Sequence, residues 1–175
     1  TISKNDKVGV IFFSDMIEKF IPAQKGKTHV LHIIRELLSF EPSSTGTDIA
    51  QALQYFSNAQ KRHCTAFLIS DFIGVEGLEK PLMIASNRHE VNAIQIYDRR
   101  ETELPNVGLV KFHDAETGQD LWVDTAVASV REQYASEWKQ NQSRIEQLCT
   151  KTGVKRMSVR TDEDYVKALM KLFKS

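Results

Sequence analysis

The hydrophobic pattern of the chain alternates between short continuous apolar runs and stretches with helical spacing. The runs "VGVIFF" (8–13), "TAFLIS" (65–70) and "VNAIQIY" (91–97) are rich in β-formers and typical of strands buried on both faces. This alternation of strands with helices predicts a doubly wound α/β fold, in which a mostly parallel sheet carries helices on both faces. The helical spacing is found in three segments, 28–40, 47–59 and 78–87.

Two segments depart from the parallel pattern. The run "EKFIPA" (18–23) follows the first strand after only four residues, a link too short for a parallel crossover, and Pro22 suits a sheet edge. Segment 107–125 contains two alternating runs around "AETG", the pattern of a β-hairpin in which Gly118 supplies a positive φ. We therefore expect an antiparallel edge strand and an inserted hairpin over 107–125.

The C-terminal third predicts a long helix over about 126–151, ended by Gly153, and a more polar strand over 154–160 near an edge. Thr161 and Asp164 occupy capping-box positions before a last helix. No repeat or linker interrupts the chain, so we expect one domain over 1–175. The last helix is expected to turn four apolar residues inward, Val166, Leu169, Met170 and Phe173.

Composition narrows the functional classes. Hydrophobic residues make up 41% and charged residues 26% of the 175, which is ordinary for a soluble protein with one core. Lys plus Arg equals Asp plus Glu at 23 each, so the charge gives no reason to expect nucleic acid as partner. No apolar run approaches the roughly 20 residues of a membrane span. Cys64 and Cys149 lack metal-binding spacing, and we expect reduced thiols in a cytoplasmic protein, with a single disulfide between them as the open alternative.

The candidate chemistry consists of one hydroxyl and one carboxylate. Thr47 begins the helix at 47–59, and Asp71 directly follows the strand at 65–70. Helix starts and strand ends meet at the same edge of a parallel α/β sheet, so both residues are expected to face one crevice. Oxygen ligands of this kind suit Mg²⁺. The N-cap of this helix is expected to be Thr47 or Asp48. The alternative, that Thr47 only caps its helix and Asp71 only starts a turn, stays open.

Five segments of the chain carry a resemblance to one protein family: "NDKVGVIFFSD", "RELLSFEPSSTGTDIAQAL", "FLISDF", "IQIYDRRETELPNVGLVKFHDAETGQDLWVDT" and "TDEDYVKAL". They resemble the bacterial family known as domain of unknown function 58, which is related to von Willebrand factor A domains. The resemblance implies a metal-ion-dependent adhesion site, in which Thr47 of "STGTD" matches the family threonine and Asp71 of "ISDF" matches its second aspartate. It also implies Mg²⁺ or Mn²⁺ in the intact protein and a MoxR-type AAA+ ATPase as partner.

The chain departs from the family pattern at its start. The family's first strand and its Asp-x-Ser-x-Ser loop would precede "NDKVGV", so we expect this chain to be the C-terminal part of a longer protein and to hold no metal by itself. The missing strand would lie between 8–13 and 65–70. These two strands are expected either to pair directly or to form a homo-oligomer through their open edges.

These observations favour a non-enzymatic, metal-dependent protein-interaction module that acts with a MoxR-type AAA+ ATPase in the assembly or maturation of other proteins. Two alternatives stay open. One is a metal-free scaffold that uses the hairpin at 107–125 as its contact surface. The other is a metal-dependent, phosphatase-like hydrolase using Asp71 and Asp98, against which stands the lack of a nucleophile–base pair or a phosphate loop.

Overall fold

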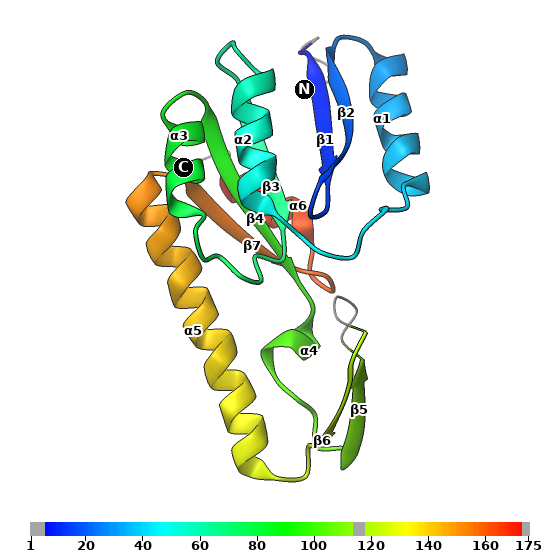
Figure 1. The fold of residues 1–175 in the computed structure, drawn as a ribbon, viewed down its shortest axis with the longest axis vertical. Helices are drawn as coiled ribbons and strands as arrows, with labels where there is room; N and C mark the ends of the chain where they lie inside the picture. The colour runs from blue at the N-terminus through cyan, green and yellow to red at the C-terminus, as the bar shows by residue number, and fades with distance from the viewer. Residues whose placement is uncertain (1–5, 114–117, 173–175) are drawn as a thin grey trace. The chain divides into compact units, whose positions relative to one another are not determined.

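The computed structural model describes residues 6–113 and 118–172. Figure 1 shows the strands and helices in chain order. By internal contacts the chain divides into two compact units, Thr1–Gln60 and Lys61–Ser175, and each is described by itself. The expectation of a single domain over 1–175 stays a prediction.

The first unit is built on an antiparallel strand pair, β1 (Val8–Phe13) and β2 (Ile17–Gln24). Antiparallel pairing was predicted from the short link and is confirmed. The pair is followed by α1 (Lys27–Ser39) and α2 (Ile49–Ala59). Helix α2 contacts both strands and buries Ile49, Ala52 and Leu53, so it forms the main part of this unit's core.

Helix α1 was predicted from its apolar spacing and is present, but none of its residues is buried. Leu37 is 62% exposed and Leu38 is 82% exposed. The half-buried apolar residues of the helix are Val30 and Ile33. The helix also contacts the strands through polar groups, since His29 Nε2 lies 2.8 Å from the carbonyl oxygen of Val8 and Lys19 pairs with Glu36. The apolar spacing therefore predicted the helix, but only part of its apolar face is covered.

The second unit contains a parallel sheet of β3 (Thr65–Ser70), β4 (Glu90–Tyr97) and β7 (Lys155–Arg160), in the order β3-β4-β7. In the central strand β4, residues 91–95 are all buried, as expected for a strand covered on both faces. The more polar strand β7 lies at an edge, as predicted.

Helices cover this parallel sheet on both faces. Helix α3 (Glu79–Ser86) packs against α5 (Ala128–Thr152), and α6 (Tyr165–Leu172) packs against β7. In Figure 1, α6 lies behind the sheet, on the side away from α3 and α5. Gly153 ends α5 with a left-handed φ of 67°, as expected for a C-cap glycine. The predicted fold class, a doubly wound α/β sheet with an antiparallel strand pair and a hairpin, is confirmed.

The start of α6 differs from the prediction. The Asp164 carboxylate accepts a hydrogen bond from the Val166 amide at 3.0 Å, whereas the Thr161 hydroxyl donates to Asp98. The capping role predicted for Thr161 was therefore wrong, because its hydroxyl has a partner at the end of another strand. The inward face is also only partly confirmed, since Val166 and Met170 are about half exposed, and Phe173 lies outside the described residues.

The inserted hairpin consists of β5 (Leu109–His113) and β6 (Asp120–Asp124), which pair antiparallel. It follows the short helix α4 (Arg99–Thr102) and leads into α5 (Figure 1). Gly118 has the positive φ expected of it, 70°, and the other turn residues of "AETG", 115–117, lie outside the described residues.

The base of the hairpin is anchored by one buried threonine. Thr125 is 1% exposed, and its hydroxyl donates to the Gly108 carbonyl at 2.7 Å and accepts from the Val107 amide at 3.0 Å. Arg131 Nη1 donates to the Thr125 carbonyl at 2.6 Å. The described residues of the two strands are exposed or half-buried, so the fold depends on the base rather than on the ribbon.

We predict that replacing residues 112–121 with a short turn leaves the melting temperature nearly unchanged, because the replacement removes little buried surface. Thr125→Val should instead lower the free energy of unfolding by about 1 kcal/mol or more, since it removes two hydrogen bonds at the base. Thermal and urea unfolding of both variants test this contrast. Loss of cooperative unfolding in the hairpin replacement would contradict it.

Candidate functional site

Asp71 lies immediately after β3, at the carboxyl end of the parallel sheet, and its side chain is exposed. The next residue, Phe72, has a φ of 57° and is 1% exposed. Phe72 is the only residue other than glycine with a positive φ within the described part of the chain. This unusual conformation buries the Phe72 ring while the preceding carboxylate stays in solvent.

The Asp71 carboxylate takes part in the turn with one of its two oxygens. Its Oδ1 accepts hydrogen bonds from the Ile73 amide at 3.2 Å and from the Ser70 hydroxyl at 3.3 Å. In the described residues, both hydrogen bonds to this carboxylate go to Oδ1. Asp71 therefore starts a turn, as the simpler interpretation holds, and Oδ2 is still available to a ligand.

Thr47 is exposed in the loop that precedes α2, and it does not cap that helix. The cap is Asp48, whose carboxylate accepts from the Gln51 amide at 2.8 Å. Of the two N-cap candidates, Asp48 is confirmed and Thr47 is not the cap. Metal ligation by Thr47 stays a prediction.

The loop around Thr47 is attached to the turn between β1 and β2. The Asp48 amide donates to the Ser14 carbonyl at 2.8 Å. A Cβ placed on Gly46 would lie 3.3 Å from Cβ of Asp15, so only glycine fits there without displacing that side chain. The residues on either side of Thr47 are thus held against the turn between β1 and β2.

A second carboxylate in this region, Glu18, serves the same attachment. It accepts from the Ser14 hydroxyl at 2.8 Å and from the Ser43 amide at 2.9 Å, and these bonds, that of Ser14 foremost, lower the pKa of Glu18. The sequence carried no signal for this link, because Glu18 lies in a strand and Ser43 in a loop 25 positions later.

Thr47 belongs to the first unit and Asp71 to the second, so their pairing stays a prediction. Within the residues that the structure describes, no three or more His, Cys, Asp or Glu side chains come together in a group that would hold a metal ion. A hydroxyl and a carboxylate have the right chemistry for Mg²⁺ or Mn²⁺. They are only two ligands, however, and water or other residues would have to complete the coordination.

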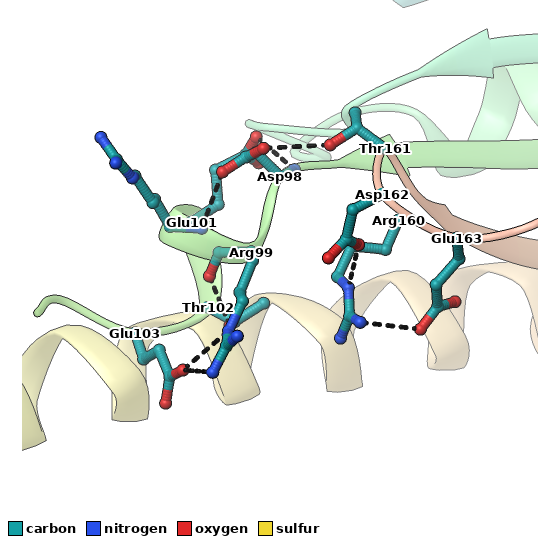
Figure 2. Close-up of polar contacts among 10 residues, drawn as sticks. Asp98, Arg99, Glu101, Thr102, Glu103, Arg160, Thr161, Asp162 and Glu163 are labelled. Carbon is teal, nitrogen blue, oxygen red and sulfur yellow. Dashed lines mark hydrogen bonds and ion pairs between the residues drawn. The ribbon is translucent and has the colours of Figure 1, made fainter.

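Asp98 follows β4 as Asp71 follows β3, but both of its oxygens are used by the fold. Figure 2 shows its carboxylate between the start of α4 and the end of β7. Oδ1 accepts from the Arg100 amide at 2.9 Å and Oδ2 from the Thr161 hydroxyl at 3.0 Å. The Asp98 amide donates to Glu101 Oε1 at 2.8 Å, which completes a capping box. The hydrogen bonds that the carboxylate accepts from Arg100 and Thr161 lower the pKa of Asp98, and the bond from the Arg100 amide makes the largest contribution.

The two cysteines are free thiols, as expected. Burial raises the pKa of both Cys64 and Cys149. A raised pKa keeps each sulfur protonated at neutral pH, which disfavours thiolate chemistry. Cys64 Sγ lies 3.6 Å from His89 Nδ1, a contact that the sequence did not predict.

We predict that Thr161→Val raises the pKa of Asp98 towards its ordinary value of about 3.9, because the carboxylate loses a hydrogen-bond donor. A lowered folded-state pKa stabilises the protein above the ordinary value, and this stabilisation is lost as the pH falls through the folded-state pKa. The variant should therefore lose part of that stabilisation near neutral pH. An NMR titration of the Asp98 carboxyl carbon measures the shift.

Thr102→Val is the matched control, since the Thr102 hydroxyl donates to the Arg99 carbonyl and not to Asp98. Equal Asp98 pKa values in the two variants would contradict the assignment of Thr161.

Comparison with known proteins agrees with this architecture. Residues 1–144 match the family described as "Protein of unknown function DUF58". The chain is 29% identical to uncharacterized protein MAV169 of Mycobacterium avium, covering 89% of this chain and 92% of that protein. It is 28% identical to uncharacterized protein Rv1480 of Mycobacterium tuberculosis over 97% of this chain, and it spans 54% of that protein's length.

Two solved structures share the fold. BatB from Bacteroides thetaiotaomicron superposes with a TM-score of 0.53 at 18% identity, over 99% of this chain and 83% of that one. An aerotolerance-related membrane protein from Bacteroides fragilis superposes with a TM-score of 0.57 at 17% identity, over 98% of this chain and 81% of that one. In the described part of this chain, no helix combines the length and apolar character that crossing a bilayer requires. The match over residues 1–144 assigns the chain to the DUF58 family.

Proposed function

We propose that this protein is a non-enzymatic protein-interaction module that binds its partner through Asp71 in a Mg²⁺- or Mn²⁺-dependent manner. The observation that carries the proposal is the exposed carboxylate at the end of β3, which engages the turn through Oδ1 alone. Ligands of open α/β sheets bind at the carboxyl ends of the strands. The contrast with Asp98, whose two oxygens are both occupied, supports the choice of Asp71.

Asp71 and Thr47 would supply two of the metal's oxygen ligands. Mg²⁺ commonly keeps several waters and binds through one or two carboxylates. Two protein ligands are therefore enough for a weakly bound ion whose other coordination positions are filled by water. A bound ion would present a positive charge to a carboxylate of the partner. Because the set is small, we expect this chain alone to bind the metal weakly.

The proposed partner is a MoxR-type AAA+ ATPase, and the proposed role is the assembly or maturation of other proteins. This part of the proposal follows from the family resemblance. A catalytic role is not proposed, because the sequence has no phosphate-binding loop and the contacts of Asp98 are those of a capping residue.

A metal-free scaffold that binds through the hairpin is the second candidate. The hairpin presents large apolar side chains to solvent, with Leu109, Leu121 and Trp122 each more than 60% exposed. Exposed apolar surface of this kind is common where proteins dock.

Self-association through open strand edges is a further part of the proposal. Among the described residues of its own unit, β1 has β2 as its single ladder partner, and β3 has β4. Each strand thus has one edge of backbone amides and carbonyls without a ladder partner. Such edges favour pairing with another chain.

We predict that Mn²⁺ added to this chain broadens the amide NMR signals of Phe72 and Ile73 and binds with a dissociation constant weaker than about 10⁻³ M. Asp71→Asn should abolish the broadening, and Thr47→Ala should reduce it less, because it removes a ligand but no charge. Asp98→Asn is the matched control and should leave the broadening unchanged. Broadening that persists in Asp71→Asn would contradict the metal assignment.

Binding to a MoxR-type AAA+ ATPase separates the candidate functions. Under the proposal, binding is lost on adding EDTA and in Asp71→Asn. Binding that survives both, but is lost when residues 112–121 are replaced, would instead favour the scaffold. Metal-dependent turnover of a phosphomonoester panel, lost in Asp71→Asn, would favour the hydrolase.

Light scattering tests self-association. We expect dimers or larger species whose population grows with protein concentration, because pairing satisfies the open edges. A monomer at high concentration, with the amides of residues 8–13 all protected from exchange, would show that the strand edges are satisfied within one chain.

A further inference from the structure

The turn at Asp71 and Phe72 needs support from its surroundings, because a large residue other than glycine rarely adopts a left-handed backbone. A conformation of this kind costs on the order of 1–3 kcal/mol and persists only where neighbouring groups enforce it. Burial of the Phe72 ring supplies one constraint. The two backbone carbonyls of the turn supply two more.

The first carbonyl is held by Gln95 of β4, which is paired in register with Ser70 at the end of β3. Gln95 is completely buried, and its Nε2 donates to the carbonyl oxygen of Asp71 at 3.0 Å. Its Oε1 accepts from Arg156 Nη2 at 2.8 Å and from the Ser158 hydroxyl at 3.1 Å. Because a guanidinium only donates, the amide oxygen must face Arg156, and the amide nitrogen is directed at Asp71.

The second carbonyl is held from a different element. Asn141 of α5 donates from Nδ2 to the carbonyl oxygen of Phe72 at 3.3 Å. The next residue, Gln142, accepts from Arg156 through its backbone carbonyl at 3.4 Å and also through its side chain. The turn is therefore fixed from β4 and from α5, and Arg156 joins the two supports.

We infer that Gln95 and Asn141 are positioning residues for Asp71, which set the direction of its carboxylate by holding the two carbonyls of the Asp71–Phe72 turn. Neither side chain needs to touch the ligand. The inference rests on the proposed function of Asp71, and it adds to it the groups that keep the carboxylate in place.

Gln95→Glu is the most informative variant. It keeps an acceptor for Arg156 but removes the donor to the Asp71 carbonyl, and it places a carboxylate oxygen against that carbonyl. We expect the variant to fold and the turn to loosen, so that the exchange rate of the Ile73 amide, which donates to Asp71 Oδ1, rises about tenfold. The Mn²⁺-induced broadening at Phe72 and Ile73 should weaken by a comparable factor.

Asn141→Asp removes the second donor with little change in shape, and we expect a smaller rise in Ile73 exchange, about threefold. It also provides the test if Gln95→Glu does not fold. Gln140→Glu is the matched control on α5, because Gln140 is exposed and its side chain bonds only to Ser136 within the described residues. The control should leave both measurements unchanged.

The outcomes separate this inference from the proposed function. Unchanged Ile73 exchange and unchanged Mn²⁺ broadening in both Gln95→Glu and Asn141→Asp would overturn the positioning role. The unsubstituted protein could also show no Mn²⁺ broadening while the two variants still speed up Ile73 exchange. That result would support the positioning role of Gln95 and Asn141 and refute the metal assignment of Asp71.

Discussion

The buried amide of Gln95 is the contact through which the end of β3, the strand β7 and, by way of Arg156, the helix α5 are joined. A polar group without contact to water is stable only when its hydrogen-bonding groups are paired, and the losses are large when one partner is removed. Gln95 pairs its oxygen with two donors and its nitrogen with one acceptor. An apolar residue of the same size would leave the Arg156 guanidinium and the Asp71 carbonyl without these partners.

The hydrogen-bonding groups of the cluster formed by Gln95, Gln142 and Arg156 are not all paired. Arg156 Nε and Gln142 Nε2 are buried and have no hydrogen-bond partner in the described residues. Each such group costs free energy, so the cluster stabilises the fold less than an apolar core of equal volume would. Its effect is to fix geometry, because only one arrangement of the amide and the guanidinium satisfies the remaining groups. This fixed geometry suits a site in which the Asp71 carboxylate must stay directed toward solvent.

The sequence predicted the parts of the fold that depend on local periodicity. The continuous run at 91–97 predicted a strand covered on both faces, and β4 is buried at five successive residues. The periodicity did not predict that Gln95, the one long polar side chain in that run, would be the central contact. Its partners Arg156 and Ser158 lie more than 60 positions away, and the left-handed φ of Phe72 has no signature in "ISDF". Asp71 and Asp98 likewise look alike in sequence, because Thr161, which distinguishes them, follows Asp98 by 63 positions.

The composition of the strands also indicates which edges of the sheets β1-β2 and β3-β4-β7 suit pairing with a further strand. Edge strands usually carry charges or proline, which discourage pairing with other chains. Strand β2 has Glu18, Lys19 and Pro22, and β7 has two arginines and a lysine, so both have the composition of edges. Strands β1 and β3 have no charged residue and no proline, yet each has a single ladder partner in the described residues. Each sheet therefore has one protected edge and one edge whose residues suit a strand with two neighbours. A further strand would therefore meet neither charged residues nor proline at the free edges of β1 and β3, and these are the edges where addition is most favourable.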